Sequence, residues 1–80
     1  MSITVWRLDD GTFHATDDEC THYFASLREA GELDGPVVTC SMHMAKFDVR
    51  TGAALCRPAR LPLATYPVEV TVKGEVYVIA

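Results

Sequence analysis

Two short segments organise this sequence: Cys20-Thr21-His22 and Cys40-Ser41-Met42-His43, with residues 23–39 between them. In each segment a cysteine comes first and a histidine follows two or three positions later. Two thiolates and two neutral imidazoles suit a [2Fe–2S] cluster in which one iron binds only sulfur and the other only nitrogen. The two motifs therefore predict a chain that moves single electrons.

A structural zinc ion is the competing interpretation, because zinc also binds two cysteines and two histidines in a tetrahedral site. Common zinc motifs pair Cys with Cys and His with His, as in C-x₂-C followed by H-x₃₋₅-H. Here each motif mixes the two residue types, which favours the cluster. A structural zinc-binding module without a redox role stays the alternative from another class.

The chain has 80 residues, which predicts a single domain over residues 1–80. The hydrophobic core of a domain of this size supplies only about 3–5 kcal/mol of stability, so we expect a bound group that stabilises the fold further. The net charge is −4, with eight acidic and two basic residues in positions 1–40 and three and five in positions 41–80. This balance argues against nucleic acid. It either steers a protein partner with a basic or mixed face or serves only to keep the domain soluble.

The compartment is predicted from what the sequence lacks. No segment has the pattern of a secretion signal, and no apolar run approaches the ~18 residues of a membrane-spanning helix. Three cysteines are an odd number, which argues against a disulfide framework. We therefore expect a cytoplasmic protein with no membrane partner. The third cysteine, Cys56, is expected to be a buried small hydrophobic residue.

Alternating and β-branched segments separated by turn residues predict an all-β domain. One hairpin opens the chain and another closes it, and together they form a small antiparallel base. A loop-rich, cluster-binding subdomain over about residues 17–63 is inserted between them. Ser26 and Glu29 have capping-box spacing. The expected segments are strands 3–8, 12–15, 37–39, 47–49, 66–72 and 75–79, a helical turn 26–30 and a Pro-containing loop 56–63.

Several side chains outside the motifs have both a structural and a functional interpretation. Trp6 and Phe13 are expected in the core, and His14 is expected to be a strand residue and not a ligand. The acidic run Asp17-Asp18-Glu19 either steers a basic partner or is simply solvated. Met42 and Met44 either form an apolar docking rim around His43 or pack against the second motif and shield the cluster.

The sequence resembles the Rieske-type [2Fe–2S] ferredoxins of aromatic-ring-hydroxylating dioxygenase systems. Both motifs carry the resemblance, and it extends over nearly the whole chain. It implies a Rieske-type fold and one [2Fe–2S] cluster per chain, with Cys20 and Cys40 on the inner iron and His22 and His43 on the outer iron. The flanking segments that share it are 17–19, 25–27, 31–35, 47–52, 58–59, 62–63 and 66–68.

The same resemblance implies a role and partners. The chain would take one electron from a flavoprotein ferredoxin reductase and pass it to a terminal oxygenase, without catalysing a bond change itself. It would be a monomer or a weak oligomer. The alternative within this class is the Rieske-type small subunit of a reductase such as nitrite reductase.

The chain departs from the Rieske proteins of respiratory complexes, which resemble C-T-H-x-x-C with C-P-C-H-G-S-x-Y. In those proteins two cysteines form a disulfide, and Ser and Tyr donate hydrogen bonds to cluster sulfur. Here Ala25 and Met42 stand at the disulfide positions, and Ala45 and Phe47 stand at the hydroxyl positions. Fewer donors stabilise the reduced form less, so we predict a potential near the bottom of the Rieske window of about −150 to +300 mV.

Overall fold

The structure is a computed structural model that describes residues 2–21, 25–41, 44–56 and 61–79. Antiparallel strands dominate this described part, and a four-residue helix interrupts them. The all-β fold class predicted from the sequence is confirmed. The elements are β1 (Ile3–Arg7), β2 (Phe13–Asp17), α1 (Leu27–Ala30), β3 (Gly31–Asp34), β4 (Val37–Cys40), β5 (Lys46–Asp48), β6 (Ala54–Cys56), β7 (Thr65–Tyr66), β8 (Val68–Val70) and β9 (Val76–Val78).

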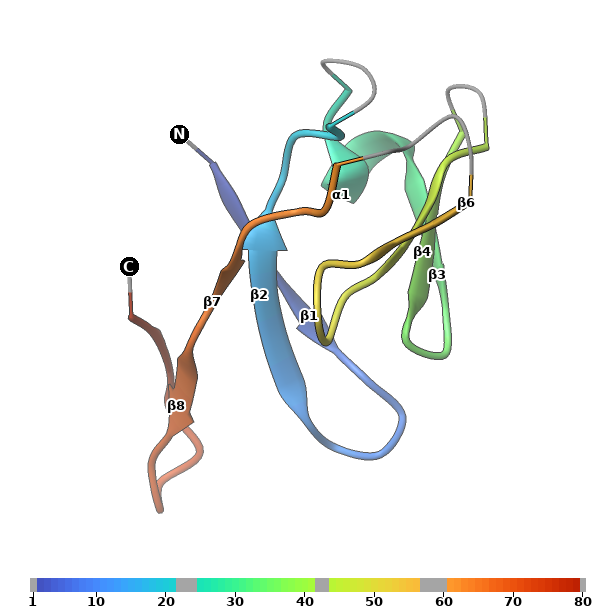
Figure 1. The fold of residues 1–80 in the computed structure, drawn as a ribbon. Coiled ribbons are helices and arrows are strands. Elements are labelled where there is room, and N and C mark those ends of the chain that lie inside the picture. Colours follow the sequence, from blue (N-terminus) through green and yellow to red (C-terminus); the bar gives the residue numbers. More distant parts are fainter. Residues whose placement is uncertain (1, 22–24, 42–43, 57–60, 80) are drawn as a thin grey trace.

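The opening hairpin, β1 and β2, forms an antiparallel sheet with β7 in the order β1-β2-β7. Its register runs from Ile3 opposite Asp17 to Arg7 opposite Phe13. Gly11 in the connecting turn has a φ of 87°, a conformation that glycine adopts without steric cost. The predicted opening hairpin is confirmed, and β2 leads directly towards the first motif (Figure 1).

A second antiparallel sheet, in the order β3-β4-β5-β6, carries the second motif. β4 ends at Cys40, so this strand delivers the cysteine to the end of the sheet. The predicted strands 37–39 and 47–49 correspond to β4 and β5, whereas the sequence pattern does not predict β3 or β6. β3 has the sequence Gly-Glu-Leu-Asp, which has low intrinsic β-propensity and pairs because β-branched β4 lies beside it.

The helical turn α1 connects the first motif to β3 and confirms the turn predicted at residues 26–30. Ser26 takes the N-cap position but makes no side-chain cap hydrogen bond. The predicted capping box is therefore wrong, because the Ser26 hydroxyl instead bonds the carboxylate of Asp18. Among the described residues, no helix has the length and apolar character needed to cross a membrane.

β8 and β9 form a separate two-stranded hairpin, which projects from the body of the molecule (Figure 1). Its turn is closed by a hydrogen bond of 2.9 Å from the amide of Gly74 to the carbonyl of Thr71. The predicted closing hairpin is confirmed, with one change. Its first expected residue, Tyr66, pairs with β2 as part of β7.

The hydrophobic core draws side chains from both larger sheets and from α1. Burying one Leu, Val or Phe side chain contributes roughly 1.5–3 kcal/mol. Trp6 is confirmed as a core residue, whereas Phe13 is only half-buried. The Trp6 indole Nε1 donates a buried hydrogen bond of 3.0 Å to the hydroxyl of Thr16. The core cluster contains Trp6, Leu8, Cys20, Leu27, Val38, Cys40, Ala45, Phe47, Val49 and Leu63.

Candidate metal centre

The two motif loops are closed by the same kind of backbone hydrogen bond, between residues i and i+5. The amide of Cys20 donates to the carbonyl of Ala25 at 3.0 Å, and the amide of Cys40 donates to the carbonyl of Ala45 at 2.7 Å. Cys20 is 3% exposed, Cys40 is 0% exposed, and both belong to the same core cluster. The fold therefore brings the two predicted sulfur ligands into one apolar core from equivalent loop positions.

The two predicted nitrogen ligands, His22 and His43, lie outside the described residues. Within the described ranges, no group of three or more His, Cys, Asp and Glu side chains is arranged to hold a metal ion. The described part of the chain thus provides two of the four predicted ligands. Their apolar surroundings fit the sulfur half of a cluster site, because a hydrophobic shell restricts solvent access to the metal.

Two described residues of the Pro-containing segment 56–63 contact the two motif loops. The Thr21 hydroxyl donates to the carbonyl of Leu61 at 2.8 Å, and the Cys56 thiol donates to the carbonyl of Met44 at 3.8 Å. The described ends of these segments gather at one end of the molecule (Figure 1). The prediction that Cys56 is buried is wrong, because this residue is exposed on the edge strand β6.

Asp18 connects the first motif loop to β1 and α1. Its Oδ1 accepts hydrogen bonds from the Thr4 hydroxyl at 2.6 Å and from the Arg28 amide at 2.9 Å. Its backbone carbonyl accepts from the Leu27 amide at 2.7 Å. Burial acts to raise the pKa of Asp18, but hydrogen bonds from Ser26, Thr4 and the Arg28 amide outweigh it and hold that pKa below its ordinary value.

The acidic run before the first motif has a structural role at two of its three positions. Asp17 and Asp18 are half-buried, whereas Glu19 is exposed. Asp17 accepts a hydrogen bond from the Tyr66 hydroxyl, and this bond is the main cause that raises the pKa of Tyr66. Sequence reasoning misses both roles, because the donors to these carboxylates lie far away in the chain or on the backbone.

The other end of α1 contacts the second motif loop. The carbonyl of Ala30 accepts a hydrogen bond of 2.8 Å from the amide of Ser41. The next residue, Gly31, pairs with Cys40 across β3 and β4. A Cβ atom at Gly31 would lie 2.4 Å from the carbonyl oxygen of Leu27. The same Cβ atom would lie 2.9 Å from Cγ2 of Val38 in β4, so glycine at position 31 lets α1 and the strand of the second cysteine lie this close together.

The second motif loop ends in a residue with an uncommon backbone conformation. Met44 has a φ of 61°, in the left-handed region that residues with a side chain seldom adopt. Its side chain is exposed, which favours the docking-rim interpretation over inward packing. Ala45 and Phe47, which follow it, are fully buried and offer no hydroxyl group to the site.

The profile of the Rieske [2Fe-2S] domain family matches residues 1–67. This chain belongs to the Rieske [2Fe-2S] domain family. Rieske domains hold a [2Fe–2S] cluster with two cysteines and two histidines, the same donor set that the two motifs contain. Membership of this family argues against the structural zinc interpretation.

Relatives of this Rieske domain include ferredoxin components of dioxygenase systems. The biphenyl dioxygenase ferredoxin subunit of Pseudomonas sp. (strain KKS102) is 54% identical over 61 residues, 76% of this chain and 56% of that protein. The p-cumate 2,3-dioxygenase ferredoxin component of Pseudomonas putida is 49% identical over 69 residues, 86% of this chain and 58% of that protein. The Rieske domain thus spans less than two thirds of the length of these two relatives.

A solved structure confirms the Rieske-type fold. It is a complex of reduced oxygenase and oxidized ferredoxin in carbazole 1,9a-dioxygenase. One of its chains matches this Rieske domain with a TM-score of 0.88 and 47% identity. The match covers 96% of this chain and 76% of that chain.

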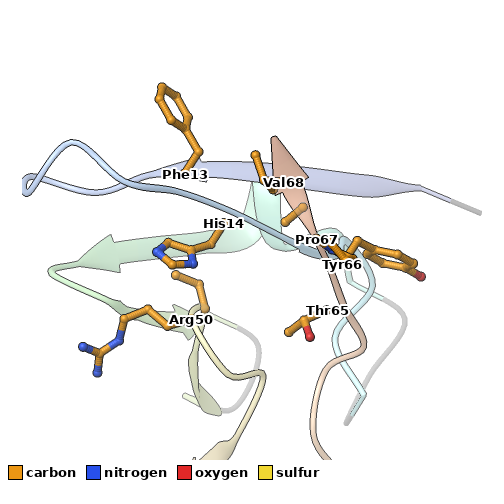
Figure 2. Close-up of a pocket in the computed structure, with 9 residues that line it drawn as sticks. Phe13, His14, Arg50, Thr65, Tyr66, Pro67 and Val68 are labelled. Carbon is orange, nitrogen blue, oxygen red and sulfur yellow. The ribbon is translucent and has the colours of Figure 1, made fainter. Parts of the chain in front are cut away.

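A pocket of about 510 Å³ lies between β2, the turn after β5 and the segment from β7 to β8. Figure 2 shows His14 and Arg50 on one side of this pocket and Tyr66 and Pro67 on the other. The His14 imidazole contacts the Thr12 hydroxyl at 2.9 Å, in keeping with its predicted place in a strand. Neither Cys20 nor Cys40 lines this pocket. Its walls are formed by Phe13, His14, Ala15, Val49, Arg50, Thr65, Tyr66, Pro67 and Val68.

Proposed function

We propose that this Rieske domain is a one-electron carrier of an aromatic-ring-hydroxylating dioxygenase system and catalyses no bond change itself. It receives an electron from a flavoprotein ferredoxin reductase and passes it to the terminal oxygenase. The observation that carries the proposal is the pair of buried cysteines in equivalently closed loops. The 54% identity of the Rieske domain with a biphenyl dioxygenase ferredoxin subunit over 61 residues supports the assignment to an aromatic dioxygenase system.

In this proposal Cys20 and Cys40 bind the inner iron, and His22 and His43 bind the outer iron. When bound, the cluster supplies reversible one-electron chemistry. Two neutral imidazoles in place of two thiolates make the centre less negative, so it accepts an electron more readily than an all-cysteine centre. The burial of both cysteines keeps water away from the sulfur ligands.

Exposed apolar side chains beside the motif loops provide the contact surface for both partners. Met44, Leu55 and Leu61 are 60%, 49% and 65% exposed. They belong to the segments that gather at the motif end of the molecule (Figure 1). Interfaces of electron carriers are small, below about 1,200 Å², so a few such side chains suffice and the carrier leaves each partner readily. The two partners therefore use this surface in turn.

We also propose the setting in which the carrier works. It acts in the cytoplasm, as a monomer or a weak oligomer, and contacts neither nucleic acid nor membrane. Residues 1–80 form one domain, and about residues 17–63 form its cluster-binding part. The acidic net charge of −4 supports the exclusion of nucleic acid.

Cysteine variants test the ligand set, with a matched control in the same chain. Cys20→Ser and Cys40→Ser should lose the red-brown colour and the low-g electron paramagnetic resonance signal of the reduced protein. Cys56→Ser should keep both, because this thiol is exposed on β6. His22→Ala and His43→Ala should lose or change the signal. A colourless wild-type protein that contains zinc would refute the proposal.

Surface variants test the transfer of electrons with a purified flavoprotein ferredoxin reductase and terminal oxygenase of an aromatic dioxygenase system. Leu61→Gln and Met44→Gln should slow electron delivery several-fold without changing the reduction potential, because they remove apolar contact area and add no charge beside the cluster. Val72→Gln is the control, since Val72 is exposed on the remote β8–β9 hairpin. Equal rates for all three variants would contradict the assigned surface, and no transfer by the wild-type protein would contradict the assigned function.

A further inference from the structure

The turn α1 spans the space between the two motif loops. At its first end, the amides of Leu27 and Arg28 donate to the carbonyl and the carboxylate of Asp18, at 2.7 and 2.9 Å. At its last end, the carbonyl of Ala30 accepts from the amide of Ser41 at 2.8 Å. One turn of helix therefore joins the two loops through hydrogen bonds at both of its ends.

These contacts lie next to the two predicted sulfur ligands. Asp18 comes two residues before Cys20, and Ser41 comes directly after Cys40. Any movement of α1 along its own axis therefore changes the position of one cysteine relative to the other. Because Gly31 has no side chain, α1 lies close to the strand that carries Cys40.

Asp18 makes two further hydrogen bonds, to residues near the start of the chain. Its amide donates to the carbonyl of Ser2 at 3.0 Å, and its carboxylate accepts from the Thr4 hydroxyl of β1 at 2.6 Å. Asp18 is thus fixed to the first sheet, while the same carboxylate holds the amide of Arg28 in α1. The first sheet and α1 thus meet at this one side chain, and α1 in turn reaches the second loop through the bond between Ala30 and Ser41.

We propose that Asp18 is a positioning residue, whose carboxylate anchors α1 and thereby sets the separation of Cys20 and Cys40. The inference rests on the proposed function, because it concerns the same ligands. Metal sites tolerate displacements of their ligands of only about 0.5 Å. Loss of the anchor should therefore loosen the contact of α1 with Ser41, reduce cluster retention and change the signal of the reduced cluster.

Asp17 provides a control that is matched in charge. It is the adjacent carboxylate and is also half-buried, but it accepts its hydrogen bond from Tyr66 in β7 and not from α1. Asp17→Ala and Asp18→Ala remove the same charge from neighbouring positions. Any effect of Asp18→Ala that Asp17→Ala does not share therefore comes from the anchor. Asp18→Asn is the conservative variant, because its amide oxygen still accepts a hydrogen bond.

The experiment compares wild type, Asp18→Ala, Asp18→Asn and Asp17→Ala as purified proteins. Hydrogen exchange of the Ser41 amide reports the contact with α1 without reference to electron transfer. In Asp18→Ala this exchange should be about tenfold faster or more, since the local opening costs less free energy. Iron and sulfide content should fall, and the g values of the reduced protein should shift. Asp18→Asn should keep most of the wild-type Ser41 protection, iron and sulfide content and g values, and Asp17→Ala should match wild type in Ser41 exchange.

Other outcomes overturn the inference. These are wild-type Ser41 exchange and g values in Asp18→Ala, or the same changes in Asp17→Ala. Should Asp18→Ala fail to fold, Thr4→Val, which removes one donor to that carboxylate, should speed Ser41 exchange several-fold, and unchanged exchange overturns the inference. If the wild-type protein lacks a Rieske signal, the proposed function fails. The Ser41 exchange data still decide whether Asp18 anchors α1.

Discussion

Gly31 lies directly opposite Cys40 across the β3–β4 pair. A side chain at Gly31 would approach the carbonyl oxygen of Leu27 to 2.4 Å and the Cγ2 atom of Val38 to 2.9 Å. A backbone carbonyl cannot turn away as a flexible side chain can. Either α1 or β3, which carries position 31, would have to move. Because β3 pairs with β4 at Cys40, the size of the residue at position 31 is coupled to the position of Cys40.

Gly31→Ala should therefore both destabilise the fold and impair the metal centre. We expect a loss of about 1–3 kcal/mol in the free energy of unfolding, the usual cost of overpacking, together with a lower iron content. Urea unfolding and iron analysis measure the two effects. Gly74→Ala is the control for iron content: its φ of 84° makes the substitution costly for the local hairpin, but nothing lies within 4 Å of a Cβ atom there, so it should retain full iron content. Wild-type stability and iron content in Gly31→Ala would show that the close approach is unimportant.

The buried hydrogen bond between Trp6 and Thr16 predicts an asymmetric response to mutation. Thr16→Val removes the acceptor and leaves the indole N–H of Trp6 buried without a partner. An unsatisfied buried donor costs about 1–3 kcal/mol of unfolding free energy, which urea unfolding measures. Thr12→Val removes surface hydrogen bonds to Asp10 and His14 and should cost less than about 0.5 kcal/mol. Equal losses in the two variants would contradict the importance of burial.

The ion pair between Asp48 and Arg50 predicts that the stability of the fold depends on pH. Hydrogen bonds from Arg50 hold the pKa of Asp48 below its ordinary value, against the opposing effect of burial. The folded state thus favours the ionised carboxylate. The pair stabilises the fold above the unfolded pKa of about 3.9, and this contribution is lost as the pH falls through the lower folded pKa. Asp48→Asn should lose stability relative to wild type at neutral pH, and the difference should shrink in acid. Urea midpoints measured across this pH range test it, and a constant difference would contradict it.

The residues after the second motif predict the reduction potential. Ala45 and Phe47 are buried beside Cys40 and carry no hydroxyl group to donate to cluster sulfur. We expect the midpoint near the lower limit of the Rieske range, about −150 mV. A redox titration followed by electron paramagnetic resonance measures it, and Ala45→Ser should raise it by supplying a donor. A wild-type midpoint well above zero would refute this account.

The sequence predicts those strands that carry a strong local signal. β4 is β-branched, and the opening and closing hairpins each have a turn glycine with positive φ, Gly11 and Gly74. β3 and β6 have no such signal and pair because of their neighbours in the sheet. The register shift between Lys46 and Phe47 accompanies the pairing of β6, and neither feature is visible in the local pattern. The wrong prediction for Cys56 has this origin.

The candidate site was predictable where its chemistry depends on residue type and spacing. Cys20 and Cys40 stand out because thiolates are scarce and follow a fixed pattern, and both are buried in one core. His22 and His43 follow from the same pattern and stay predictions. Asp18 was not predictable as an anchor, because its partners include a backbone amide and a hydroxyl from β1. Such contacts arise from the tertiary fold and leave no motif.

The β8–β9 hairpin places Lys73, at its turn, far from the motif loops (Figure 1). The sequence contains one other lysine, Lys46, and Lys46→Arg would leave Lys73 as the lysine available for coupling. Immobilisation through this amine on an electrode would turn the motif end of the molecule towards the solution. The shape of the fold thus provides an oriented attachment for bioelectrochemical use.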